Sequence, residues 1–167
     1  MKTYVITLSK QFPTGHIKAG QETFFKEQLE RALKGYDCHV IEHPDGLTTV
    51  INGRKLHTIR ANFPLWSERI SQVQRGEAVL SVRQWTGKPY RSKQREIARL
   101  TASDGVGIQR LDLNDLNQSA TVVEGNRVEL ISLSKNDGLT FEDWHEWFKD
   151  YDLSAPLAII HFTRFRY

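Results

Sequence analysis

The fold class is indicated by residues 78–100, whose sequence is AVLSVRQWTGKPYRSKQREIARL. Residues 78–85 and 94–100 alternate between apolar and polar side chains, the pattern of β-strands that turn one face to the core. The connecting Thr86-Gly87-Lys88-Pro89-Tyr90-Arg91 contains a glycine and a proline, which interrupt regular structure. This segment therefore predicts two strands joined by a loop.

Further strands are predicted on both sides of this segment, from β-branched, aromatic and alternating residues. They are expected over 3–8, 38–41, 47–51, 106–113, 121–133 and 157–166, with a turn at 124–126. Because the strands are not each followed by a helix, we predict a mainly β (α+β) domain and not a doubly wound parallel sheet. The expected architecture is a closed or nearly closed barrel with about three inserted helices, forming a single domain over 1–167.

The three helices are predicted from their spacing and their end signals. Apolar residues recur at helical spacing from 24 to 33, and Gly35 follows where helices often end. Asn62 and Pro64 suit the start of a second helix, since asparagine caps helices and proline fits their first turn. Thr140 with Asp143 matches a capping box at the start of a third helix.

The composition is that of a globular protein that needs no crosslinks. Of the 167 residues, 39% are hydrophobic and 26% are charged. The single cysteine, Cys38, forms no internal disulfide, and no Cys/His spacing matches a structural zinc site. No stretch approaches the roughly 18 apolar residues that span a bilayer, and the N-terminus does not resemble a signal peptide. We expect a soluble, cytoplasmic protein with no metal, cofactor or membrane partner; the sequence leaves its oligomeric state open.

The charges are segregated along the chain. Residues 53–100 carry eleven basic and three acidic side chains, a net charge of +8, whereas residues 101–156 carry four basic and eleven acidic, a net charge of −7. A positively charged surface would attract phosphate groups. The alternative is that the two segments meet in the fold and neutralise each other.

The segment with the most chemistry is Gly53-Arg54-Lys55-Leu56-His57-Thr58-Ile59-Arg60. It combines three cations, a histidine and a hydroxyl, and its glycine allows the backbone to approach a ligand. A lysine acts as a nucleophile only when desolvation or neighbouring cations lower its pKa, and Arg54 and Arg60 could supply such cations. The alternatives are a solvated surface lysine and an ordinary strand threonine.

This segment resembles the signature of the ASCH domain, a small β-barrel of the PUA-like superfold. The match is Gly53-Arg54-Lys55-x-x-Thr58-Ile59-Arg60, and residues 76–83, 136–140 and 157–162 resemble later parts of the family. The resemblance covers roughly residues 53–165. Residues 1–52 match only loosely and are expected to form an N-terminal extension packed on the barrel.

The resemblance implies one of two activities. Most ASCH domains are inferred to bind RNA or nucleotides in a cleft beside the motif. One short branch hydrolyses 4-acetylcytidine, with the motif lysine as nucleophile or base, the motif threonine beside it and a glutamate from the C-terminal helical region. By position these roles fall on Lys55, Thr58 and Asp137, the last being an aspartate in place of glutamate. Asp137 could also be a simple turn residue in Asn136-Asp137-Gly138.

The loop after residue 85 adds a second group of candidates. Residues 85–93 interleave two aromatic residues with three cations, and aromatic rings stack on bases while cations contact phosphates. The alternative is a tight turn with solvated cations. The candidate ligand-binding residues are Arg54, His57, Arg60, Arg83, Trp85, Lys88, Tyr90 and Arg91, and we expect Arg60, Arg83, Lys88, Tyr90 and Arg91 to converge on one concave surface.

The predicted function is therefore the binding of RNA or of a nucleotide or nucleoside ligand in a basic cleft. The first alternative is an amidohydrolase that removes an acyl group from a modified cytidine with Lys55. The second is a protein-interaction module whose acidic C-terminal half binds a basic partner.

Overall fold

In the computed structural model, which describes residues 1–36, 38–51 and 54–167, the chain forms two β-sheets and several helices. The strands are β1 (Lys2–Leu8), β2 (His39–Glu42), β3 (Leu47–Ile51), β4 (His57–Arg60), β5 (Ala78–Trp85), β6 (Gln94–Leu100), β7 (Gly107–Asp112), β8 (Ala120–Val123), β9 (Asn126–Glu129) and β10 (Leu157–His161). The helices are α1 (Phe25–Lys34), α2 (Phe63–Gln74), α3 (Leu130–Asn136) and α4 (Phe141–Phe148), with a 3₁₀-helix η1 (Ala102–Asp104). The predicted α+β class is confirmed.

The strands belong to two separate sheets. A three-stranded sheet has the order β1-β5-β6, with β1 parallel and β6 antiparallel to β5. A seven-stranded sheet has the order β2-β3-β9-β8-β7-β10-β4. Within the described residues its outer strands, β2 and β4, are not paired with each other. The predicted closed barrel is therefore wrong.

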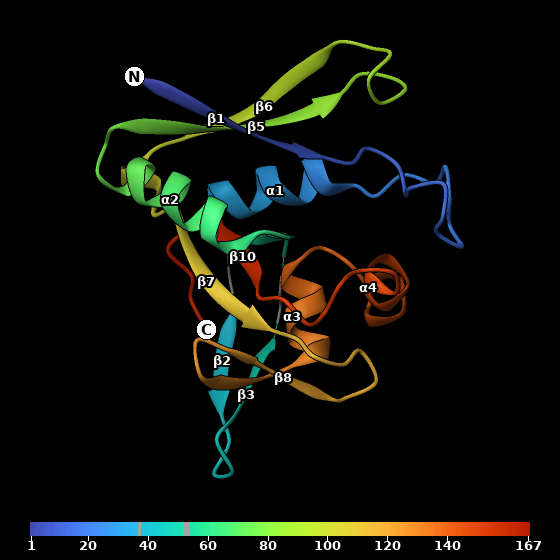
Figure 1. Cartoon of the computed structure of the whole chain (residues 1–167), viewed down its shortest axis with the longest axis vertical. Coiled ribbons are helices and arrows are strands. Elements are labelled where there is room, and N and C mark those ends of the chain that lie inside the picture. The colour runs from blue at the N-terminus through green and yellow to red at the C-terminus, as the bar shows by residue number, and fades with distance from the viewer. Residues whose placement is uncertain (37, 52–53) are drawn as a thin grey trace.

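Helix α2 explains why the sheets do not close. It packs against β5 of the small sheet and against β7 and β10 of the large sheet, and α1 and α2 lie between the two sheets (Figure 1). Its buried Trp66, Ile70 and Val73 contribute to the main hydrophobic core. Because a helical layer covers their inner faces, the two sheets bury apolar surface without pairing edge to edge.

The two residues predicted to cap helices, Asn62 and Thr140, do so in the structure. Asn62 has a φ of 66°, and its side chain accepts a hydrogen bond from the backbone N–H of Leu65 at the start of α2. The Thr140 hydroxyl accepts a hydrogen bond from the backbone N–H of Asp143 at the start of α4. These caps satisfy amide groups that have no partner inside their helices.

Helix α3 is a fourth helix, where the sequence predicted a strand continuing to residue 133. Strand β9 ends at Glu129, and Leu130 and Leu133, both fully buried, lie on one face of a helical turn because they are three residues apart. The helix ends at Asp137, and Gly138 follows with a φ of 90°, in the left-handed region that favours glycine. This turn directs Asp137 into the protein.

The two ends of the chain also shape the fold. Residues 1–52 supply β1 to the small sheet and β2 and β3 to the large sheet, so they form part of both. The last strand, β10, ends at His161 and not at 166. The backbone N–H of Phe162 then donates to the carbonyl of Leu56, beside the motif. Among the described residues, no helix has the length and apolar character needed to cross a membrane.

Candidate functional site

Lys55 is held inside the protein by the backbone around it. It precedes β4, and the N–H of Leu56 donates to the carbonyl of Asn136 at 2.8 Å, while the carbonyl of Leu56 accepts from Phe162 at 2.9 Å. These bonds fix the motif between the end of α3 and the end of β10. Lys55 is consequently only 1% exposed, which is rare for lysine unless a partner compensates its charge.

The partners of the Lys55 ammonium account for all three of its N–H groups. Its Nζ lies 2.6 Å from the Asp137 carbonyl, 3.2 Å from Asp137 Oδ1 and 3.2 Å from the His57 carbonyl. It also lies 4.0 Å from the centre of the Phe25 ring, a cation–π contact. Because an ammonium has three donors and no acceptor, this arrangement suits the charged form of Lys55.

Asp137 is the matching anion. It is the C-cap of α3, so its carbonyl and the helix end favour a nearby cation. Its Oδ1 faces Lys55, and its Oδ2 accepts a hydrogen bond from Trp144 Nε1 at 3.1 Å. Burial raises the pKa of the Asp137 carboxyl, but Lys55 and His57 lower it by more, so the net shift is downward. Asp137 therefore remains a carboxylate at neutral pH.

The amine of Lys55 is shifted as well. Burial lowers the pKa of Lys55 below its ordinary value of 10.5; Asp137 opposes this shift and Arg60 adds to it. The pair is thus a buried ion pair in which the lysine releases its proton more readily than a surface lysine does.

A small cavity lies next to this pair. Its volume is about 20 Å³, and its polar lining comes from Ser9, Lys55, Thr58, Arg60 and Asp137. A cavity of that size has room for about one water molecule. The candidates Lys55, Thr58 and Asp137 therefore meet at one cavity; their catalytic roles stay a prediction.

Thr58 and Arg60 differ in how their polar groups are used. Thr58 is only 4% exposed, but its hydroxyl, which makes no hydrogen bond to another described residue, is not among the fully buried polar atoms that lack a partner. Arg60 is half-buried, and its Nη2 donates to the carbonyl of Thr7 at 2.7 Å. A guanidinium has five N–H donors, so Arg60 retains donors for a ligand.

A second polar network lies behind the ion pair. The Tyr167 hydroxyl accepts from Asn136 Nδ2 at 3.0 Å and lies 2.7 Å from His57 Nε2. If this hydroxyl donates to Nε2, the His57 proton is on Nδ1, which lies 3.6 Å from Asp137 Oδ1. That distance is too long for a hydrogen bond, and Nδ1 has no partner within the described residues. Burial lowers the pKa of His57, so His57 is neutral at neutral pH.

Sequence reasoning missed four residues of this site: Phe25, Asn136, Trp144 and Tyr167. Trp144 lies on α4, seven residues after Asp137. An aromatic residue on a predicted helix gives no signal that its N–H binds a carboxylate. Tyr167 follows the last predicted strand, and no motif marks it. In the part of the chain that the structure describes, no three His, Cys, Asp or Glu side chains are grouped to hold a metal ion.

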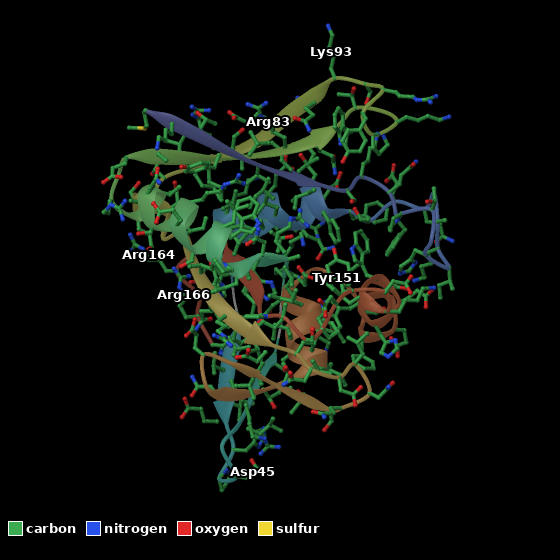
Figure 2. The ribbon with its side chains drawn as sticks, viewed as in Figure 1. Asp45, Arg83, Lys93, Tyr151, Arg164 and Arg166 are labelled. Atoms are coloured by element: carbon green, nitrogen blue, oxygen red, sulfur yellow. The ribbon has the colours of Figure 1, made fainter. Side chains whose placement is uncertain are left out.

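The remaining motif and strand candidates lie away from the cavity. Arg54 is exposed, and Gly53 lies outside the described residues. On β5, Arg83 is on the face opposite to the buried Val82, and Figure 2 shows it on the side of the small sheet that is turned away from α1 and α2.

The hairpin candidates form a separate group. Trp85 ends β5, and Lys88, Tyr90 and Arg91 are exposed in the loop that follows. Arg60 donates into the interior, and none of these four residues lines its cavity. The expected convergence of Arg60, Arg83 and the hairpin residues on one concave surface is therefore not seen.

Comparisons of the chain with protein-family models, with curated proteins and with solved structures find no match.

Proposed function

We propose that the chain is an ASCH-type domain that binds a nucleoside-containing ligand, either RNA or a modified nucleotide, at the Lys55 cavity. The observation that supports this proposal is the meeting of Lys55, Thr58 and Asp137 beside one cavity. These are the three positions to which the sequence resemblance assigns the family's functional residues, and two of them lie 82 residues apart. A solvated lysine or an isolated turn aspartate would not have this arrangement.

The chemistry of the cavity favours an oxygen-rich group. Lys55 and Arg60 contribute two positive charges against the single carboxylate of Asp137, and the Thr58 hydroxyl is without a partner among the described residues. A carbonyl oxygen of a base or an acyl group can accept hydrogen bonds from Thr58 and Arg60. Because the cavity has room for about one water molecule, only that group enters it in the present conformation.

The rest of a nucleoside requires the cavity to widen. The apolar wall includes Phe25 of α1 and Trp147 of α4, which lie with ring centres 5.7 Å apart. We expect these rings to separate when the ligand binds and to pack against its base, since aromatic faces stack on bases.

A second candidate function is hydrolysis of an acylated cytidine, favoured by the partnerless Thr58 hydroxyl beside a carboxylate and two cations. In this version a water attacks the acyl carbon, or the Thr58 hydroxyl does so and water then hydrolyses the resulting ester. The C–N bond breaks, the released amine takes the proton of the attacking hydroxyl or water, and water supplies the oxygen of the released acid. Three acceptors hold the Lys55 amine, so its role here is to stabilise negative charge on the acyl oxygen, whereas the sequence predicted a nucleophile or base.

The experiment is calorimetric titration with cytidine, 4-acetylcytidine and a short RNA, paired with chromatographic detection of cytidine. Thr58→Val, which keeps the side-chain shape, should weaken the binding of cytidine and 4-acetylcytidine, and Thr58→Ser should preserve it. Lys55→Arg should retain more binding than Lys55→Met, because it keeps the charge; the exposed Lys34→Met is the control. The proposed site is contradicted if none of these ligands binds, or if Thr58→Val leaves the binding of cytidine and 4-acetylcytidine unchanged. The hydrolytic version is identified if the unmodified protein releases cytidine from 4-acetylcytidine and Thr58→Val does not.

A further inference from the structure

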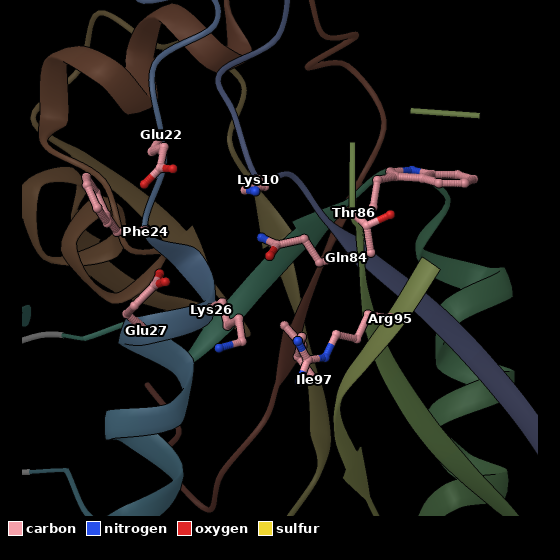
Figure 3. Close-up of a pocket in the computed structure, with 10 residues that line it drawn as sticks. Lys10, Glu22, Phe24, Lys26, Glu27, Gln84, Thr86, Arg95 and Ile97 are labelled. Carbon is pink, nitrogen blue, oxygen red and sulfur yellow. The ribbon is translucent and has the colours of Figure 1, made fainter. Parts of the chain in front are cut away.

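A second and larger pocket lies between α1 and the hairpin of β5 and β6. Its volume is about 360 Å³, within the range of ligand pockets, and it shares no lining residue with the Lys55 cavity. Figure 3 shows Arg95 of β6 extending across the pocket toward α1, while Glu22 and Glu27 lie on the other side. Lys26 of α1 also lines the pocket, and its ammonium pairs with Glu30 at 3.0 Å. The pocket lining therefore mixes both charges, with Lys10, Lys26 and Arg95 against Glu22 and Glu27.

Two exposed aromatic residues at this pocket and on the adjoining hairpin have an unusual backbone. Phe24 has a φ of 59° and is 57% exposed, and Tyr90 has a φ of 63° and is 90% exposed. The left-handed region is unfavourable for bulky side chains, and such residues ordinarily gain stability by burying their rings. Neither does so here. Backbone strain that brings no burial is typical of residues kept for binding.

The pocket and the hairpin form one continuous surface. Trp85 lines the pocket, and its ring centre lies 5.2 Å from that of Tyr90. The loop is ordered by the Thr86 N–H, which donates to the carbonyl of Lys93 at 2.9 Å, and by the Ser92 hydroxyl, which donates to the carbonyl of Lys88 at 2.8 Å. We call the three aromatic residues and the exposed cations of the loop the hairpin surface; its members are Phe24, Trp85, Tyr90, Lys88, Arg91 and Lys93.

We propose that the hairpin surface binds single-stranded nucleic acid. Unpaired bases would stack on the aromatic rings, and phosphates would contact the three cations, which have no acidic neighbour in residues 86–93. An acidic peptide would use the cations and leave the rings in water. A flat anionic membrane could contact the cations but could not enter the pocket. The alternation of rings and cations therefore favours a strand of bases and phosphates.

The class of ligand in this proposal, nucleic acid, rests on the proposed function. The two sites also lie next to each other in the structure. The consecutive residues Ser9 and Lys10 line the cavity and the pocket respectively, as do Phe25 and Phe24. The two hollows thus share a wall built from the end of β1 and the start of α1. A strand on the hairpin surface would bring a nucleotide to the far side of the wall that encloses Lys55.

The test measures fluorescence anisotropy of labelled oligouridine and oligothymidine, each about ten nucleotides long, at about 50 and 200 mM salt. Phe24→Asn and Tyr90→Asn remove a ring, and asparagine tolerates a positive φ, so folding should be preserved. Each should weaken binding about tenfold while the melting temperature is unchanged or higher. Replacing Lys88, Arg91 and Lys93 by glutamine should also reduce the slope of log affinity against log salt by about 2. The controls are Arg31→Gln with Lys34→Gln on α1, and Glu124→Asn, another residue with a positive φ.

Binding that requires the hairpin surface, whichever oligonucleotide is preferred, supports the proposal. It is overturned if the unmodified protein binds neither oligonucleotide, or if the hairpin variants bind as well as the control variants. It is also overturned if polyglutamate or anionic vesicles bind as tightly as the oligonucleotides and lose the same affinity in Tyr90→Asn. Thr58→Val separates the two proposals, because it should weaken nucleoside binding and leave oligonucleotide binding to the hairpin surface intact.

Discussion

Lys55 and Asp137, which are 82 residues apart in the sequence, form an ion pair of 3.2 Å in the interior, and the Lys55 ammonium also donates to the Asp137 carbonyl at 2.6 Å. The backbone N–H of Leu56, which donates to the Asn136 carbonyl at 2.8 Å, joins the same two segments. A buried pair of this kind gives little net stability compared with apolar side chains, because both charges lose their water. Removing only one partner, in contrast, is costly.

The first prediction follows from this asymmetry. Lys55→Met leaves the Asp137 carboxylate buried without its cation and should lower the free energy of unfolding by about 3–5 kcal/mol. Lys55→Met combined with Asp137→Asn removes both charges and should recover most of this loss. Urea denaturation measures both effects, with the exposed Lys34→Met as control. A double variant no more stable than Lys55→Met would contradict the ion-pair interpretation.

The second prediction concerns pH. Burial lowers the pKa of His57, and it lowers the pKa of His161 well below the ordinary value of 6.5. Between the folded-state pKa and about 6.5, the unfolded chain binds protons that the folded chain does not, so stability is lost as pH falls through this window. The free energy of unfolding should drop by up to about 1.4 kcal/mol per pH unit for each histidine.

Urea denaturation from about pH 7.5 to about pH 5.5 tests this dependence. The His161 ring contacts Gln109 Oε1 at 2.9 Å, and a glutamine at position 161 can still donate to that oxygen. His161→Gln should therefore remove about half of the slope of the free energy of unfolding against pH. His43→Gln, on the exposed turn after β2, is the control. An equal slope in His161→Gln and the unmodified protein would refute the assignment.

Most strands could be predicted because their signal is local. The alternation in residues 78–85 and 94–100 and the caps at Asn62 and Thr140 depend only on neighbours within a few positions, and the structure has the expected elements there. The division into two sheets depends on where α2 packs, which is a long-range property that no local pattern contains. Helix α3 was missed because its seven residues follow a strand and have no capping signal at Glu129.

The site was predictable only in part. The motif and its resemblance pointed to Lys55, Thr58 and Asp137, but a sequence does not show whether a lysine is buried, and lysine is almost always exposed. Trp144 contacts Asp137 through its indole N–H, and the spacing of apolar residues in a sequence does not predict such a hydrogen bond. The expected convergence of cations failed because Arg60 lies on β4 of the large sheet and Arg83 on β5 of the small sheet, a division that charge blocks along the chain cannot reveal.

The third prediction concerns the turn that delivers Asp137. A Cβ atom at Gly138 would lie 3.2 Å from Lys55 Cβ and Cδ, and the φ of 90° is itself unfavourable for alanine. Gly125 has a similar φ of 82° with nothing within 4 Å of such a Cβ. Gly125→Ala should therefore cost about 1 kcal/mol from backbone strain alone, and Gly138→Ala clearly more, because it also displaces Lys55. Thermal unfolding measures both; equal losses would mean that Gly138 matters only for its φ.

The last prediction isolates the hydrogen bond that completes the carboxylate's environment. Trp144→Phe keeps most of the buried aromatic surface but removes the Nε1–H that donates to Asp137 Oδ2 at 3.1 Å. Because a hydrogen bond to a charged group contributes about 1.5–3 kcal/mol, the free energy of unfolding should fall by about that amount at neutral pH. The loss should shrink in the Asp137→Asn background, where the acceptor carries no charge. Trp147→Phe is the matched control, since Trp147 packs against Phe12 and Phe25 through its rings alone among the described residues. Trp144 stabilises the protein by packing, and not through Asp137, if two results are found. Trp144→Phe would lower the free energy of unfolding no more than Trp147→Phe does, and its effect would be the same with Asp137 and with Asn at position 137.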